Sequence, residues 1–153
     1  MKRIIFLFVI SIIAMKVAGQ DQRLIDSLKN NLSNSKDDTN KVRSSMYIAD
    51  AYVWSQPDTA LYYATQSLTL AQKLNDTGGQ IFNLGTLGYI YSMRRNDSLA
   101  ISAMFRSIHL SENSSSRRKN NSLEDMSIVC YNIGDYQQAI SYAYKLQDRK
   151  SVV

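Results

Sequence analysis

The feature of this chain that most restricts its fold is an internal repeat with a period of about 40 residues. Ala60, Ala100 and Ala139 each follow a short polar break, and they recur at a nearly constant interval. A second apolar or small segment precedes each alanine, namely IADAY (48–52), LGYIY (87–91) and MSIVC (126–130). Each unit therefore predicts two helices, and the constant period indicates a fold built by repetition.

The composition agrees with an all-α chain, because 153 residues contain one proline and six glycines, and few segments alternate apolar and polar residues. We expect an N-terminal helix and loop over residues 20–38. A repeat domain at 39–153 follows, with helix pairs at 40–75, 79–112 and 121–150. In the N-terminal helix one apolar stripe is expected to cover the first pair, and its members are Leu24, Ile25, Leu28 and Leu32.

Local signals place the ends of these helices. Pro57 suits the first turn of a helix, where its missing N–H costs nothing. Gly134 suits the left-handed position that ends a helix, and Asp135 can cap the next one. The segments NDTGG (75–79) and SENSSSRRKNNS (111–122) are expected to be a helix end and a solvated loop.

Small residues on the predicted helix faces indicate close packing of antiparallel helices. Ala49 is expected to face Ala60, and Gly88 is expected to face Ala100. Larger apolar side chains on the neighbouring helix would fill the remaining space. Each pair then leaves an apolar face that only the next pair can bury.

The pattern resembles the tetratricopeptide repeat over about residues 40–150. The segment NLGTLGYIYSMRRNDSLAISAMFRSI (83–108) carries the match, with GDYQQAISYAYK (134–145) and IADAYVWSQPDTALYYATQSL (48–68) in phase with it. The resemblance implies a short right-handed superhelical solenoid whose concave groove binds a peptide or protein. The period, about 40 residues, is longer than the family's usual value of about 34. Cys130 also replaces an expected aromatic residue.

The resemblance leaves two functions open. One is a non-catalytic interaction scaffold. The other is the N-terminal periplasmic sensory region of a longer histidine kinase or transcriptional regulator, because the array is similar to the exported repeat regions of such proteins of the Bacteroidetes type. Under this second reading the chain is a fragment.

Residues 1–19 predict a signal peptide. A positive start, MKR, precedes the apolar run IIFLFVISIIAM (4–15), and small residues follow at Ala18 and Gly19. The apolar run is much shorter than the roughly 20 residues that a membrane-spanning helix needs, which disfavours the alternative of a retained anchor. We expect cleavage after Gly19 and export to the periplasm or outside the cell, with no membrane span left.

Charge and composition disfavour several other functions. The net charge of +5 includes three basic residues of the predicted signal peptide, and the remaining 15 basic and 13 acidic side chains do not predict nucleic-acid binding. Cys130 and His109 are single residues of their kinds, so neither an internal disulfide nor a metal cluster is expected. The sequence has no phosphate loop and no nucleophile motif. We expect no enzyme activity, cofactor or metal.

The resemblance also suggests partner-binding residues, because the first helix of each pair would line the groove. These residues are Asp50, Trp54, Tyr89, Met93, Tyr131 and Asn132. Packing of Trp54 and Tyr89 between repeats is the alternative. We expect no strong clamp of basic residues for an acidic peptide. The last helix has an apolar stripe that is expected to self-associate, and it includes Ala139, Ile140, Ala143 and Leu146.

Overall fold

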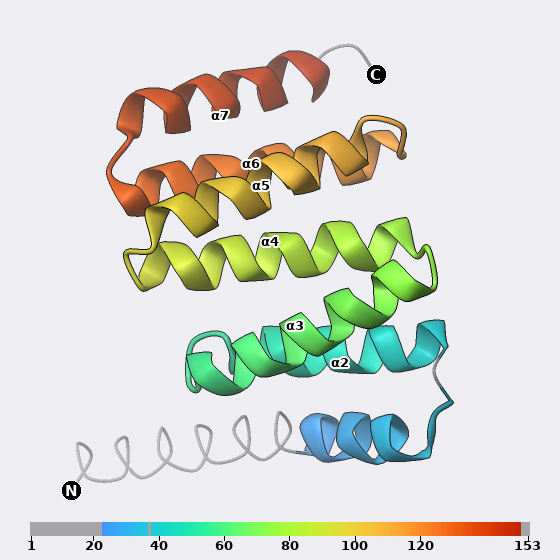
Figure 1. Ribbon diagram of the computed structural model, residues 1–153. Coiled ribbons are helices and arrows are strands. Elements are labelled where there is room, and N and C mark those ends of the chain that lie inside the picture. The colour runs from blue at the N-terminus through green and yellow to red at the C-terminus, as the bar shows by residue number, and fades with distance from the viewer. Residues whose placement is uncertain (1–22, 37, 151–153) are drawn as a thin grey trace, which may run out of the picture.

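The fold is a stack of helices laid one on the next in chain order (Figure 1). It is seen in a computed structural model that describes residues 23–36 and 38–150, so the predicted signal peptide lies outside the described residues. No strand occurs in this part of the chain, which confirms the all-α prediction. A helix over residues 23–34 comes first. The helices that follow are α2 (Thr39–Tyr52), α3 (Pro57–Lys73), α4 (Thr77–Met93), α5 (Asp97–Ser111), α6 (Ser116–Ile133) and α7 (Tyr136–Lys150).

Several predicted helix ends are confirmed. Pro57 is the first residue of α3. Gly134 ends α6 with a φ of +89°, a left-handed conformation that costs glycine no steric strain. Asp135 caps α7, because its carboxylate accepts the backbone N–H of Gln138 at 3.0 Å. The turn between α6 and α7 is therefore fixed by short-range chemistry.

The prediction for the segment 75–79 was wrong in one respect. Its two glycines do not end α3 but lie in the first turn of α4. Asp76 is the reason, because its carboxylate accepts the N–H of Gly79 at 3.0 Å and so starts the helix before the glycines. Asn75 supplies the left-handed turn instead, with a φ of +53°.

The prediction of a solvated loop over 111–122 was also wrong in its second half. Helix α6 begins at Ser116, about one turn before the expected start at residue 121. The backbone carbonyl of Ser115 accepts from the N–H groups of Arg118 and Lys119 at 2.9 and 3.2 Å. Arginine and lysine are good helix formers, and here they extend the helix in place of a loop.

The helices form two layers with different spacing. Within the described chain each helix contacts the next, and α4 also contacts both α2 and α6. The second helices of the pairs, α3, α5 and α7, make no such contacts with one another. The layer of α2, α4 and α6 is therefore the tighter one.

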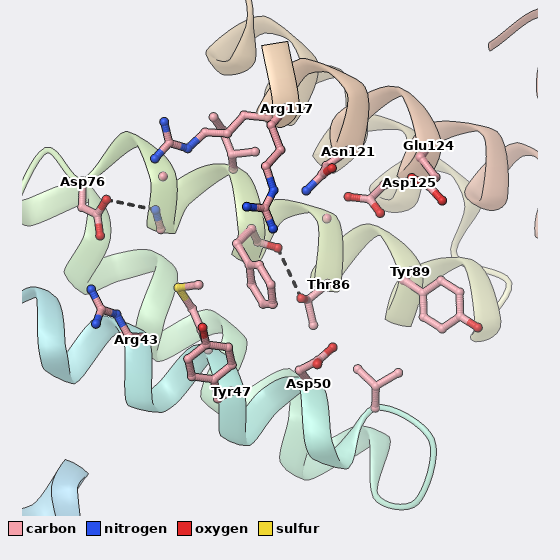
Figure 2. A pocket seen from close by; sticks show the side chains of 18 of the residues that line it. Arg43, Tyr47, Asp50, Asp76, Thr86, Tyr89, Arg117, Asn121, Glu124 and Asp125 are labelled. Atoms are coloured by element: carbon pink, nitrogen blue, oxygen red, sulfur yellow. Dashed lines mark hydrogen bonds between the residues drawn. The ribbon is translucent and has the colours of Figure 1, made fainter. Parts of the chain in front are cut away.

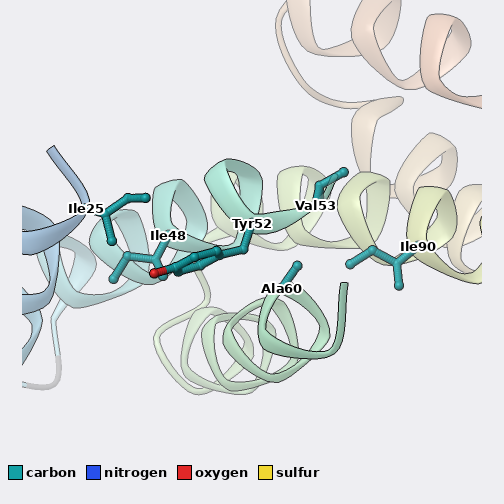
Figure 3. Packing of buried hydrophobic residues seen from close by; sticks show 6 residues of the cluster. All are labelled: Ile25, Ile48, Tyr52, Val53, Ala60 and Ile90. Carbon is teal, nitrogen blue, oxygen red and sulfur yellow. The ribbon is translucent and has the colours of Figure 1, made fainter. Parts of the chain in front are cut away.

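The hydrophobic core is divided into clusters that each join successive helices. The first joins the N-terminal helix through Ile25 to α2, α3 and α4, with Tyr52 and Ala60 between Ile25 and Ile90 (Figure 3). The second spans α2 to α5, and the third spans α5 to α7. Such a core grows along the chain and has no single centre, as expected for repeated units.

Close approach of helices depends on the small residues, as predicted. Ala60 and Ala100 are fully buried. A methyl group on Gly88 would lie 3.3 Å from the carbonyl oxygen of Ala100 and 2.5 Å from Cε of Met104. Gly88 thus lets α4 and α5 meet backbone to backbone.

The N-terminal helix covers the first pair, although with fewer residues than expected. Ile25 is buried, and Leu28 and Leu32 pack against the same cluster. Leu24 is exposed, so its place on the predicted stripe was wrong. The Lys29 ammonium adds a polar contact by donating to the Tyr52 hydroxyl at 3.1 Å.

A buried polar network follows the same period and was not predicted. Ser67 donates to the carbonyl of Val42 at 3.0 Å, and Asn83 donates to Ser67 at 2.9 Å. One repeat later, Ser107 donates to the carbonyl of Ile81 at 3.3 Å and lies 3.1 Å from the hydroxyl of Ser122. The network links both helices of a pair to the first helix of the next pair, which fixes their relative position.

Candidate functional site

A concave groove lies over the layer of α2, α4 and α6, with a volume of about 1160 Å³ (Figure 2). The three helices run in the same direction beneath it, as the order of labelled side chains along each helix shows. Helix α4 forms the floor, and α2 and α6 form the two walls. We call this feature the groove.

The lining of the groove repeats with the sequence period. Five sets of equivalent positions line the groove, and each set contributes one residue from each of the three helices. Within a set, successive members are 39 residues apart in the sequence. The sets are Thr39, Gly78 and Arg117; Arg43, Phe82 and Asn121; Met46, Gly85 and Glu124; Tyr47, Thr86 and Asp125; and Asp50, Tyr89 and Ile128. The groove is thus a direct consequence of equal repeats packed in register.

Gly85 shapes the floor of the groove beside α6. A methyl group at this position would lie 2.7 Å from Oδ2 of Asp125. Without it the Asp125 carboxylate can rest directly against the backbone of α4. The absence of a side chain at Gly85 therefore leaves room for the Asp125 carboxylate in the wall of the groove (Figure 2).

The electrostatic environment of Asp125 is unusual for an aspartate. Burial, and next to it the charge of Glu124, raise the pKa of this carboxyl from 3.8 to about 6. Asp50 faces the same space from α2 (Figure 2). None of the three carboxylates forms an ion pair within the described part of the chain. This middle section of the groove is therefore acidic.

The end of the groove near the start of α4 and α6 is basic. Arg43 contributes from α2, and Arg117 and Arg118 contribute from the first turn of α6. The Asp76 carboxylate, which caps α4, also lines this end, so three positive charges outnumber one negative charge. None of these guanidinium groups has an ion-pair partner among the residues that the structure describes. The sequence predicted a loop at Arg117 and Arg118 and no strong clamp of basic residues for an acidic peptide. The structure places both arginines in the lining of the groove.

Trp54 and Tyr89 form an aromatic edge at the other end. Their ring centroids are 5.2 Å apart with an interplanar angle of 71°, an edge-to-face contact. Both line the groove, yet Trp54 remains 76% exposed and Tyr89 is half-buried. The sequence left open whether these residues bind a partner or pack between repeats. In the structure the two rings pack between repeats and also present surface to the groove.

Three of the six predicted partner-binding residues thus line the groove, and three lie elsewhere. Asp50, Trp54 and Tyr89 are in the lining, whereas Met93, Tyr131 and Asn132 are not. The Asn132 amide donates to the Ser92 hydroxyl at 3.1 Å, and the Tyr131 ring contacts Tyr136 at the start of α7.

Sequence reasoning missed the arginines of α6, Asp125 and the glycine floor. The period could have found them, since positions 117 and 125 lie one repeat after Gly78 and Thr86. The loop assignment removed the start of α6 from that comparison.

Other chemically active side chains do not gather into a site. Cys130 is buried, and burial raises the pKa of its thiol. His109 lies on the surface, with its ring 3.4 Å from the Glu112 carboxylate. The described residues contain no cluster of three potential metal ligands. None of the helices described is both long and apolar enough to cross a membrane.

Comparison with known proteins adds no relative: neither a protein-family model nor a curated protein matches this sequence.

Proposed function

We propose that this protein is a non-catalytic scaffold that binds a peptide or protein segment in the groove. The observation that carries the proposal is the lining itself, because three consecutive repeats present side chains of mixed character to one continuous concave surface. Concave surfaces of stacked helical repeats are well suited to hold an extended partner. The exposed Trp54 ring offers the large amphipathic surface that dominates many interfaces.

The proposal includes a tetratricopeptide-like solenoid. The recurring alanines, Gly88 in the helix contact and the serine network at the same period support it. The tighter layer of α2, α4 and α6 corresponds to the inner helices that the resemblance implies. We include export after cleavage at Gly19, which rests on the sequence of residues 1–19.

A groove-blocking variant tests the proposed function. Random twelve-residue peptides displayed on phage are selected on the immobilised purified protein, and each binder is then measured against two variants. Thr86→Trp fills the groove, since Thr86 is half-buried in its lining. Thr65→Trp is the matched control, because Thr65 makes the same side-chain bond to the carbonyl four residues earlier but lies exposed on α3.

The expected result is a set of peptides that lose binding at least about tenfold with Thr86→Trp and keep it with Thr65→Trp, as for removal of a central contact. Binders that ignore both variants, or a selection without binders, would refute the proposal. Circular dichroism of both variants checks that the helices are retained.

A further inference from the structure

The groove has an ordered chemical pattern along its length. Three arginines and the Asp76 carboxylate occupy the end where α4 and α6 begin, and the carboxylates of Asp50, Glu124 and Asp125 occupy the middle. The aromatic edge of Trp54 and Tyr89 begins level with Asp50. Figure 2 shows Arg43 and Asp76 on one side and Asp50, Glu124 and Tyr89 towards the other. Both walls follow this order, since Arg43 precedes Asp50 on α2 as Arg117 precedes Glu124 on α6.

The arginines and carboxylates of the groove do not neutralise each other by pairing. No ion pair joins these arginines to these carboxylates in the described chain. Elsewhere the protein does form such a pair across helices, between Arg94 and Asp58. The charged groups of the groove are thus available to a ligand of opposite pattern, and charge complementarity of this kind selects partners.

The helix geometry sets the spacing of that pattern. Seven positions separate Arg43 from Asp50, and the same number separate Arg117 from Glu124. At about 1.5 Å per residue, the points of attachment on each helix are about 10 Å apart. An extended peptide covers that distance in about three residues at about 3.3 Å each. Trp54 lies about one further turn along, or about two peptide residues.

We infer that the groove binds an extended peptide in which an acidic residue precedes or follows a lysine or arginine by three positions, with a large apolar residue two positions beyond the basic one. The acidic group lies among the arginines, the basic group contacts Asp50 and Glu124 beside Asp125, and the apolar side chain packs on Trp54. This inference rests on the proposed function, because it names the partner of the same groove.

Four synthetic peptides test the pattern. One carries Asp, Lys three positions later and Leu two positions after Lys, in a background of Ser and Gly, with a fluorescein label. A second has the same pattern in the reverse chain direction. The other two exchange Asp and Lys and are otherwise identical, so composition and net charge are matched. Fluorescence anisotropy with the purified protein gives the affinity of each.

One of the first two peptides is expected to bind about tenfold more tightly than its exchanged counterpart, since like charges would then face each other. Glu124→Gln and Arg117→Gln should each weaken this binding about threefold to tenfold and reduce its salt dependence. Arg106→Gln is the control for loss of one charge, because Arg106 is exposed on α5 outside the groove, and it should change nothing.

The outcomes separate this inference from the proposed function. Equal affinity of matched and exchanged peptides would overturn the inference, as would groove-dependent phage peptides that lack the acidic and basic pair at this spacing. Those phage peptides would still support a peptide-binding groove. Absence of any binding that depends on Thr86→Trp, in both experiments, would overturn the inference and the proposed function together.

Discussion

Helices α5 and α7 occupy the same place in successive repeats, yet they differ strongly in burial. Helix α5 packs between α4 and α6, and its Ala100, Met104 and Ser107 are inaccessible to solvent. Helix α7 contacts α6 alone among the described helices, and only Ala139 of its described side chains is buried. Ile140 and Tyr144 remain 58% and 63% exposed. In a stacked fold, therefore, neighbours on both sides decide how much a repeat contributes to stability.

The largest effect that would test this comparison is overpacking of α5. Ala100→Trp should lower the free energy of unfolding by at least about 3 kcal/mol, because the backbone of α4 at Gly88 leaves no room for a larger side chain. Ser102→Trp, an exposed change on the same helix, should cost less than about 0.5 kcal/mol. Urea denaturation followed by circular dichroism measures both. Equal losses would show that α5 is not held between two neighbours.

Hydrogen exchange should separate the two helices directly. Amides of α5 are expected to exchange at least about a hundredfold more slowly than amides of α7, because α7 can open without disturbing the rest of the core. The measurement is mass spectrometry of a dilute sample after timed exposure to heavy water. Similar protection of both helices would contradict the comparison.

A substitution on α6 refines the comparison of α5 with α7, because α6 contacts both of these helices. Asp125 has a raised folded pKa of about 6, so its ionisation opposes folding, and the free energy of unfolding should fall as pH rises from about 4 to about 6. Asp125→Asn removes this loss and should gain about 3 kcal/mol at pH 7 relative to its effect below pH 4.

Chemical denaturation across this pH range measures the gain. Asp50→Asn, an exposed change in the same groove, should change stability by less than about 0.5 kcal/mol at either pH. Since Asp125 faces α4, the gain should leave the opening of α7 unaltered in hydrogen exchange. A wild-type free energy of unfolding that does not fall between pH 4 and 6 would contradict the raised pKa of Asp125.

The smallest predicted effect concerns the serine network of α5. Ser107→Ala removes the bonds to Ile81 and Ser122 and should cost about 1 kcal/mol. Ser141→Ala on α7, where the side chain is exposed, should cost almost nothing. Thermal unfolding of the two variants gives the difference. A greater loss from Ser141→Ala would reverse the order expected from burial.

The sequence by itself determined the elements of this fold that depend on local chemistry and on period. Pro57, Gly134 and Asp135 marked helix ends correctly because a fixed φ, a left-handed turn and a side-chain cap act within a few residues. The alanines at a constant interval determined which faces are buried, since close helix contact tolerates only small side chains there.

Only the tertiary structure decided the chemistry of the groove. The charge of its basic end depends on where α6 starts, and no strong local signal fixed the start at Ser116. The depth of Asp125 depends on Gly85, which belongs to the preceding repeat and meets it only when α4 and α6 pack. The exposure of α7 likewise depends on which helices surround it. Burial and electrostatics are set by distant neighbours, and a local pattern in the sequence does not contain them.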